Sequence, residues 1–279
     1  MTSSSEIPLC LCGGTSYTTV YAFTVPTSFI VARCTSCGLA RTLPLPYENE
    51  VDAEVYREVP FEEVLQKESL WRSFFIPLLQ TAQRYKRAGH FLDVGCGVGL
   101  LVKMAAEVGF DAYGVELSRP AALYGKEKFG LQIVPTDLVS AGFPADTFDV
   151  VTMSQVLEHI TRPEALLREI HRVLKPDGVL IAESPNLSGW VVPLLKSKWS
   201  GFQPQWHIWH FTPATIAACL ERFGYAPLEV TCGKNLYLTM PLHPLKRVLR
   251  STVWRLVEVL SESMNAADKV MIVARPSNG

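Results

Sequence analysis

Three closely spaced glycines follow an apolar segment and an aspartate near residue 95. The apolar residues Phe91, Leu92 and Val94 predict a buried parallel strand, and residues 100–107 predict a helix. The glycines after Asp93 alternate with other residues: Gly95, Gly97 and Gly99. Glycine lets the backbone approach a ligand, and a helix N-terminus offers unpaired N–H groups. A strand, a glycine turn and a helix in this order predict a nucleotide-type binding site.

Acidic residues end the next two predicted strands. Residues 111–117 predict a strand with Glu116 near its end, about 20 residues beyond the turn, where a carboxylate can accept hydrogen bonds from both hydroxyl groups of a ribose. Residues 131–137 predict a third strand that ends at Asp137. The two carboxylates are therefore expected at the same edge of a parallel sheet, beside the glycine turn.

Further elements follow in alternation. Strands are expected over 148–155 and 178–185, and a helix over 163–174 that stops at the Lys175-Pro-Asp-Gly178 turn. Thr212 is expected to cap a helix that begins at Pro213. The last strands are expected over 227–231 and 269–275.

The order of these motifs resembles class I S-adenosylmethionine (SAM)-dependent methyltransferases. D-x-G-x-G-x-G resembles their first motif, whereas a dinucleotide-binding turn would need glycine at Leu100. Val156-Leu-Glu-His-Ile160 and Leu174-Lys-Pro-Asp-Gly178 also resemble this family. The resemblance covers roughly residues 60–276. It implies a Rossmann-like α/β fold with helices on both faces of a seven-stranded, mostly parallel sheet, in the order 3-2-1-4-5-7-6, whose final strand is antiparallel.

The resemblance also implies which residues bind SAM, whose product is S-adenosylhomocysteine. Glu116 would bind the ribose, and Asp137 would face the adenine amino group. The complete expected set lies at the ends of the first four strands of this fold: Asp93, Gly95, Gly97, Gly99, Glu116, Leu117, Asp137, Leu138 and Ser154.

Four of the 7 cysteines lie near the N-terminus. Cys34 and Cys37 form a C-x-x-C-G knuckle, and Cys10 and Cys12 form a C-x-C pair. Two such pairs predict a zinc ribbon with all four thiolates as ligands; because four cysteines leave no open coordination position, the Zn²⁺ is expected to be structural. Four unrelated buried thiols are the alternative. The segment resembles the N-terminal zinc-binding module of a methyltransferase subfamily, which usually has C-x-x-C where this chain has C-x-C.

The chain divides into three predicted parts. A zinc-ribbon-like module covers 1–45, a linker with leading helices covers 46–88, and the methyltransferase domain covers 89–279. The leading helical region is expected over 62–87, interrupted near Pro77. Within the domain, residues 187–211 are tryptophan-rich and are expected to form a substrate lid, and residues 243–262 form a basic amphipathic segment.

Histidines are the candidate bases. Methyl transfer requires alignment of donor and acceptor, and for some acceptors a base. His207 and His210 lie in His207-Ile-Trp-His-Phe-Thr-Pro213, which resembles a segment that closes over substrate in this subfamily; His159 is a third candidate. A related RNA-methylating family binds a divalent metal through E-x-x-E-H and a distant histidine. Here Gln155 replaces the first acid, so we expect Glu158 and His159 to shape the acceptor pocket without a metal.

The amino-acid composition and net charge limit the kinds of partner that we expect for this chain. The chain has 279 residues, of which 48% are hydrophobic and 19% charged, with a net charge of −1. These values predict a globular protein with no electrostatic footprint for nucleic acid. The N-terminus lacks a signal pattern and no apolar run could span a bilayer, so a cytoplasmic location is expected.

The expected function is methyl transfer to an oxygen atom of a small molecule, a glycan or a lipid intermediate. The basic amphipathic segment leaves open a peripheral contact with a membrane surface. Two alternatives remain: an RNA or protein methyltransferase that uses the zinc module for recognition, and a non-catalytic SAM-binding protein. The acceptor, the pathway and the oligomeric state are left open by the sequence.

Overall fold

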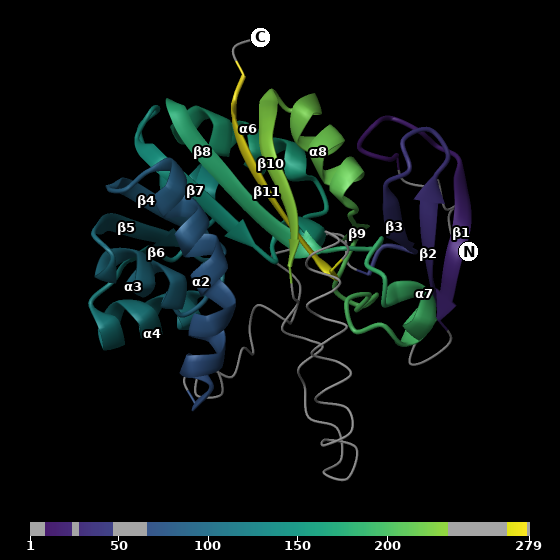
Figure 1. Ribbon diagram of the computed structural model, residues 1–279, viewed down its shortest axis with the longest axis horizontal. Helices are drawn as coiled ribbons and strands as arrows, with labels where there is room; N and C mark the ends of the chain where they lie inside the picture. Colours follow the sequence, from purple (N-terminus) through teal and green to yellow (C-terminus); the bar gives the residue numbers. More distant parts are fainter. Residues whose placement is uncertain (1–8, 24–27, 47–65, 234–266, 278–279) are drawn as a thin grey trace, which may run out of the picture.

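The computed structural model describes residues 9–23, 28–46, 66–233 and 267–277. Within these ranges the chain forms a seven-stranded sheet and a four-stranded sheet, which lie side by side (Figure 1). The larger sheet has, in spatial order, β10 (Tyr225–Gly233), β11 (Lys269–Pro276), β8 (Leu174–Pro185), β7 (Phe148–Ser154), β4 (Gly89–Val94), β5 (Phe110–Val115) and β6 (Gln132–Val134). Strand β11 is antiparallel to both of its neighbours. The predicted order and the antiparallel final strand are confirmed.

Helices cover both faces of the larger sheet (Figure 1). They are α2 (Glu68–Tyr85), α3 (Leu100–Glu107), α4 (Arg119–Phe129), α5 (Leu138–Ala141), α6 (Pro163–Val173) and α8 (Pro213–Arg222), with the 3₁₀ turn η3 (Leu157–His159). Helix α7 (Val192–Leu195) and the 3₁₀ turn η4 (Lys196–Lys198) lie beside the smaller sheet instead (Figure 1). Alternate side chains of β8 face opposite sides. Ile181 packs in the cluster that contains α2 and α3 residues. Leu180 packs in the cluster that contains α6 and α8 residues.

Several boundaries differ from those expected. Strand β8 begins at Leu174, directly after α6, so residues 175–178 belong to the strand and do not form the expected separate turn. Helix α2 continues through Pro77, although a proline in a helix interior removes one backbone hydrogen bond. Both halves of the helix are held: Leu78, after Pro77, packs in the buried cluster with α3 residues, and Phe74, before it, is buried with the Lys269 ammonium over its ring. Strand β6 ends at Val134, earlier than expected, because Pro135 has no N–H to continue the strand ladder.

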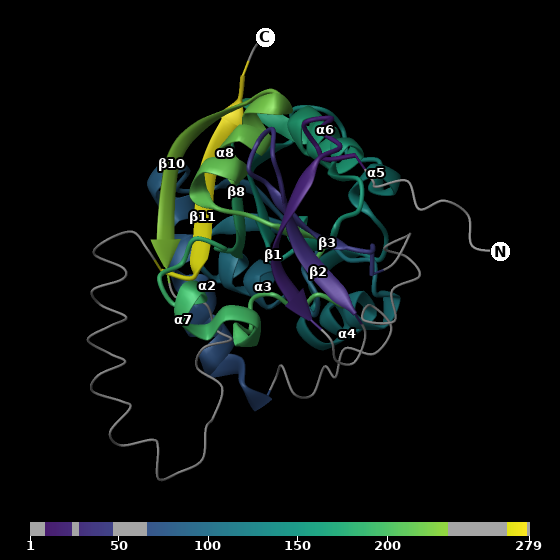
Figure 2. The same ribbon diagram turned by 90° about the vertical axis from the view of Figure 1, so that its right-hand side faces the viewer.

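The smaller sheet joins the N-terminal module to a segment more than 160 residues away. Its order is β1 (Tyr17–Phe23), β2 (Phe29–Cys34), β3 (Ala40–Leu43) and β9 (Trp209–His210). Strand β9 pairs with β3 through Ala40 opposite His210 and Arg41 opposite Trp209. Figure 2 shows this sheet in front of the larger one. The module and the expected lid segment therefore form one sheet.

The expected lid packs against the N-terminal module. Val31 and Ala40 of the small sheet share a buried cluster with Val191, Trp199 and Phe202 of the lid segment. The predicted cap of the following helix is confirmed: Thr212 and Thr215 form a capping box at the start of α8. None of the described helices is long and apolar enough to cross a membrane. The amphipathic segment 243–262 lies outside the described residues.

Candidate active site

A cavity of about 430 Å³ lies at the carboxyl ends of β4, β5, β6 and β7. This is the edge of an open α/β sheet where ligands usually bind. Seven of the residues expected at the site line it: Gly95, Gly97, Glu116, Leu117, Asp137, Leu138 and His159. Five others do not line it: Asp93, Gly99, Ser154, His207 and His210. Most of the residues expected to bind SAM therefore meet at this cavity, whereas two of the three candidate histidines do not line it.

Glu116 connects β5 to the glycine turn. One carboxylate oxygen accepts a 2.7 Å hydrogen bond from the Gly97 N–H, and the other accepts a 2.7 Å hydrogen bond from the Ser118 N–H. Burial raises the pKa of Glu116, and these N–H groups oppose that rise. The carboxylate is therefore fixed at the cavity wall, between the turn and the start of α4.

The three glycines of the turn are needed for different structural reasons. Gly97 has φ of 56°, and a Cβ there would meet nothing within 4 Å, so this position opens on the cavity. A Cβ on Gly99 would lie 2.6 Å from side-chain atoms of Leu131 and Ile133, and one on Gly95 would lie 2.6 Å from Val156. Gly95 and Gly99 permit close packing around the turn, while Gly97 leaves space for a ligand.

Asp93 supports the turn from behind the cavity lining. Its carboxylate accepts a 2.7 Å hydrogen bond from the Thr152 hydroxyl of the neighbouring strand. Burial is the main cause that raises the pKa of Asp93 to about 7, and the nearby carboxylates of Glu116 and Glu183 add to it. Asp93 therefore connects two central strands directly below the binding edge.

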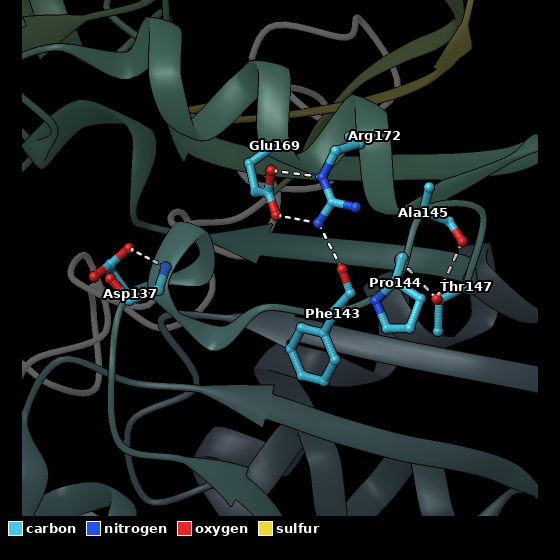
Figure 3. Close-up of polar contacts among 8 residues, drawn as sticks. Asp137, Phe143, Pro144, Ala145, Thr147, Glu169 and Arg172 are labelled. Carbon is cyan, nitrogen blue, oxygen red and sulfur yellow. Dashed lines mark hydrogen bonds and ion pairs between the residues drawn. The ribbon is translucent and has the colours of Figure 1, made fainter.

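Asp137 begins the short helix α5 at the cavity. Its side chain accepts a 2.9 Å hydrogen bond from the Ser140 N–H (Figure 3). Burial opposes ionisation of Asp137, but the Ser140 hydrogen bonds outweigh it and lower the pKa. The chain after α5 is fixed to α6, because Arg172 donates a 2.6 Å hydrogen bond to the Phe143 carbonyl and pairs with Glu169 (Figure 3).

The histidines differ in their access to the cavity. His159, at the end of η3, lines it, and its Nδ1 lies 3.1 Å from the Trp206 carbonyl oxygen. His207 is 2% exposed and lies behind His159, with ring centroids 4.7 Å apart and its Nδ1 2.9 Å from the Gly201 carbonyl oxygen. Burial lowers the pKa of His159 to about 4 and that of His207 well below its usual value, so both rings are neutral near pH 7.

His210 is engaged by the N-terminal module. The Thr42 hydroxyl lies 2.7 Å from the His207 carbonyl oxygen and 2.9 Å from Nε2 of His210. The hydroxyl has one hydrogen, which it donates to the carbonyl, so it accepts from the His210 N–H. Burial lowers the pKa of His210 to about 3. His210 therefore helps to hold β9 against β3 in a buried contact and does not face the cavity.

Three side chains of types that bind metals gather at the cavity: His159 lines it, and Glu158 and His207 are buried next to it. Ligand atoms of Glu158, His159 and His207 lie within 4.8 Å of one another. Glu158 is fully buried, and burial raises its pKa to about 8. The sequence analysis placed Glu158 and His159 together but assigned His207 to a separate lid. No local sequence pattern indicates that His207 lies beside Glu158 and His159. The two segments are joined by the hydrogen bond from the Ile208 N–H to the Glu158 carbonyl.

Two further cavity residues, Gln155 and Arg162, were not assigned to the site by the sequence analysis, which named Gln155 only as the replacement of an acid. Gln155 follows β7 directly, has φ of 57°, and presents a side-chain amide that forms no hydrogen bond with the described residues. Arg162, just before α6, also lines the cavity. Both residues follow the fourth core strand, and this position in the sequence could have indicated that they lie at the binding edge of the sheet.

The four N-terminal cysteines converge. Their sulfur atoms all lie within 4.8 Å of one another, with Cys10 and Cys37, and Cys12 and Cys34, each 3.6 Å apart. A tetrahedral site with Zn–S bonds of about 2.3 Å requires S–S separations of roughly 3.8 Å. All four are free thiols. Burial raises the pKa of the Cys34 thiol, but backbone N–H groups of Cys37 and Ser36 outweigh it, so that the pKa falls to about 7. The C-x-C pair thus completes a cluster that fits zinc.

Comparisons with known proteins agree with this geometry. The methyltransferase domain family matches residues 67–230, more than half of the chain. The ubiquinone biosynthesis O-methyltransferase of Cereibacter sphaeroides is 30% identical over 152 residues, 50% of this chain and 60% of that protein. The chain therefore spans less than two thirds of the length of this curated relative.

Solved structures share the fold. A SAM-dependent methyltransferase of Thermotoga maritima is 18% identical, with a TM-score of 0.56 over 77% of this chain and 95% of that chain. The 1,6-didemethyltoxoflavin-N1-methyltransferase of Burkholderia thailandensis, solved with 1,6-didemethyltoxoflavin and S-adenosylhomocysteine, is 15% identical, with a TM-score of 0.55 over 93% of this chain and 100% of that chain.

The fold and the glycine-turn cavity define a class I SAM-dependent methyltransferase architecture. This chain belongs to the methyltransferase domain family.

Proposed function

We propose that this chain transfers a methyl group from SAM to an oxygen atom of a small molecule, a glycan or a lipid intermediate. The observation that carries the proposal is the Glu116 carboxylate, fixed beside Gly97 where a Cβ would meet open space. SAM supplies an electrophilic methyl group. In this proposal Gly97 leaves room for SAM, Glu116 binds its ribose hydroxyls, and Asp137, which also lines the cavity, faces its adenine amino group.

The character of the cavity favours a compact acceptor. Its lining is mainly apolar, and Arg162 is the one lysine or arginine that lines it among the described residues. A groove for nucleic acid would need several basic side chains along a surface. His159 lines the cavity together with Gln155 and Val156, and in this proposal it is the histidine that acts near the reacting oxygen. His207, in contact with the His159 ring, is a positioning residue in this arrangement.

The four cysteines support a second assignment, a structural Zn²⁺ in the N-terminal module. Two sulfur pairs are 3.6 Å apart and all four sulfur atoms lie within 4.8 Å of one another, which suits a tetrahedral site. The module would then stabilise β3 and, through it, β9 and the wall of the cavity. A cytoplasmic location stays a prediction.

A transfer assay with methyl-labelled SAM tests the proposed function. The full chain is incubated with phenols, sugar nucleotides and polyprenyl-linked sugars, and in parallel with total RNA and unfolded protein. We expect label on an oxygen atom of one compact acceptor class. Label confined to RNA or protein would overturn the proposed substrate class, and the absence of SAM binding would overturn the function itself.

A further inference from the structure

Two polar side chains of the cavity have no part in the proposed contacts with SAM. Gln155 and Arg162 both line it, one directly after β7 and the other directly before α6. We propose that these two residues bind the methyl acceptor, and that this acceptor carries an anionic group, a carboxylate or a phosphate, in addition to its hydroxyl. This assignment of a substrate class rests on the proposed function and concerns the same cavity.

The amide of Gln155 is shielded from solvent without a partner. Neither its Nε2 nor its Oε1 forms a hydrogen bond among the described residues. An amide buried in this way is costly, because it has lost contact with solvent and gained no protein partner. A hydroxyl in the cavity would remove part of this cost, since it can donate to Oε1 or accept from Nε2.

The backbone of Gln155 has a conformation that glutamine rarely adopts. Its φ is 57°, in the left-handed region that favours glycine. Such strain persists only where the surrounding structure enforces it, and it is frequent at functional sites. Glycine would adopt this conformation at lower cost but would bring no amide to the cavity. The strained backbone therefore indicates that the side chain serves a purpose at this position.

A buried network anchors this end of β7. The Gln155 N–H donates a 2.9 Å hydrogen bond to the Glu183 carbonyl, and the Ser154 hydroxyl donates a 2.8 Å hydrogen bond to the Glu183 carboxylate. The other carboxylate oxygen accepts a 2.6 Å hydrogen bond from the Lys269 ammonium, in an ion pair whose side chains are 0% and 5% exposed. Because β7, β8 and β11 lie side by side (Figure 1), this network gives Gln155 a defined position, as a preorganised site requires.

Arg162 supplies the positive charge of the cavity. The cavity has two carboxylates, Glu116 and Asp137, and Arg162 is its one lysine or arginine among the described residues. Its exposed guanidinium is paired with no carboxylate in the part of the chain that the structure describes. A guanidinium keeps its charge and binds a carboxylate or a phosphate through two parallel hydrogen bonds. Arg162 therefore favours an acceptor with such a group over a neutral one.

The sheet order separates these two residues from the expected adenosine site. Glu116 and Asp137 follow β5 and β6, the glycine turn follows β4, and Gln155 and Arg162 follow β7 on the opposite side of β4. SAM with its adenosine against the two carboxylates would leave the β7 side of the cavity to the acceptor. His159, the proposed base, comes from the same stretch of chain after β7.

Binding to the full chain saturated with S-adenosylhomocysteine tests the assignment. Calorimetry compares phenol with 4-hydroxybenzoate, and glucose with glucose 6-phosphate, so that the two pairs distinguish a carboxylate from a phosphate. We expect the anionic member of at least one pair to bind at least about 10-fold more tightly. Equal binding within both pairs, or no binding of any of the four compounds, would overturn the proposal.

Variants assign the two contacts. Arg162→Gln should reduce the preference to less than about 2-fold, and Gln155→Leu should weaken both members of the preferred pair about 10-fold through the lost hydrogen bond. Arg168→Gln and Gln132→Leu are the matched controls, because both residues are exposed and do not line the cavity, and they should match the wild type. A preference that survives Arg162→Gln, or unchanged binding in Gln155→Leu, would overturn the proposal.

SAM affinity separates the acceptor from the carboxylate of SAM itself. We expect Arg162→Gln and Gln155→Leu to bind SAM within about 3-fold of the wild type, and thermal unfolding shows whether each variant is folded. A larger loss of SAM affinity in folded Arg162→Gln would assign the guanidinium to the carboxylate of SAM and would overturn its role toward the acceptor.

Methyl transfer then distinguishes this inference from the proposed function. Preferred binding of anionic compounds without any transfer would contradict the proposed function but support the anion contact of Arg162. Transfer to neutral compounds alone would support the function and overturn this inference. With a methylated anionic acceptor, Arg162→Gln should raise KM about 10-fold and leave kcat nearly unchanged, because the guanidinium binds the ground state and the transition state alike.

Discussion

The Thr42 hydroxyl lies 2.9 Å from Nε2 of His210, in a fully buried contact that joins the cysteine-bearing module to the methyltransferase domain. The same hydroxyl donates to the His207 carbonyl at 2.7 Å. One side chain of β3 therefore satisfies two polar groups of the segment that leads into α8. The module is therefore joined to the segment that carries His207, whose ring contacts that of the cavity residue His159.

Thr42→Val should destabilise the protein. It leaves the His207 carbonyl and the His210 N–H without a partner, and each buried unsatisfied group costs about 1–3 kcal/mol. Urea unfolding measures the loss. Thr35→Val, at an exposed hydroxyl bonded to the Ser16 carbonyl, is the matched control and should change the free energy of unfolding by less than about 0.5 kcal/mol. Equal effects of the two variants would contradict the importance of the joint.

His210 should make stability fall in acid. Burial lowers its pKa to about 3, whereas histidine in an unfolded chain has a pKa of about 6.5. Between these values the unfolded state binds the extra proton, so the free energy of unfolding decreases as the pH falls, by up to about 1.4 kcal/mol per pH unit.

The variant His210→Gln isolates this effect. Its amide can replace the Nε2 donor to Thr42 but does not titrate. Urea unfolding at pH 7.5, 5.5 and 4.5 should show a shallower dependence for the variant than for the wild type. Parallel curves would mean that His210 does not remain neutral in the folded protein.

Gly14→Ala should weaken zinc binding. A Cβ at Gly14 would lie 2.9 Å from the Cys34 sulfur and 3.3 Å from the Cys12 sulfur, so the thiolates must move apart. We expect a roughly 10–100-fold loss of zinc affinity in a chelator competition assay. Gly13→Ala is the control, because a Cβ there meets nothing within 4 Å, although its φ of 85° adds backbone strain. A larger loss in Gly13→Ala would show that strain, not crowding, decides the affinity.

Gly97→Ala and Gly99→Ala should separate ligand binding from folding. Both positions have positive φ, so both variants carry similar strain, about 1–2 kcal/mol. The Gly97 methyl would project into the cavity and reduce SAM affinity. The Gly99 methyl would overlap Leu131 and Ile133 and reduce the free energy of unfolding further. Calorimetry with SAM and urea unfolding check the two effects, and the reverse pattern would contradict the assignment of the cavity.

The sequence predicted the parts of the fold that depend on local pattern. Helix α3 covers residues 100–107 as expected, because a glycine turn before it and an apolar face along it define both ends. The strand order followed from the family resemblance and is confirmed. The early end of β6 was predictable in principle from Pro135, whose missing N–H ends the ladder.

Contacts between segments that are far apart in the sequence could not be predicted. The two-residue strand β9 has no pattern of its own, and its pairing with β3 depends on side chains buried on both segments, such as Val31 and Phe202. The placement of His207 behind His159 follows from that pairing. Sequence alone therefore found the three histidines but could not distinguish which one reaches the cavity.

The affinity for SAM tests the central claim most directly. Isothermal titration calorimetry compares the wild type with Glu116→Ala and with Glu107→Ala, an exposed glutamate at the opposite end of α3. Loss of a charged hydrogen-bond acceptor for the ribose should cost about 1.5–3 kcal/mol, which is roughly 10–150-fold in affinity. We expect micromolar-range binding in the wild type and in Glu107→Ala, and a loss of this size in a folded Glu116→Ala. Unchanged SAM affinity in folded Glu116→Ala, or no binding by the wild type, would contradict the assignment of this cavity as the methyl-donor site.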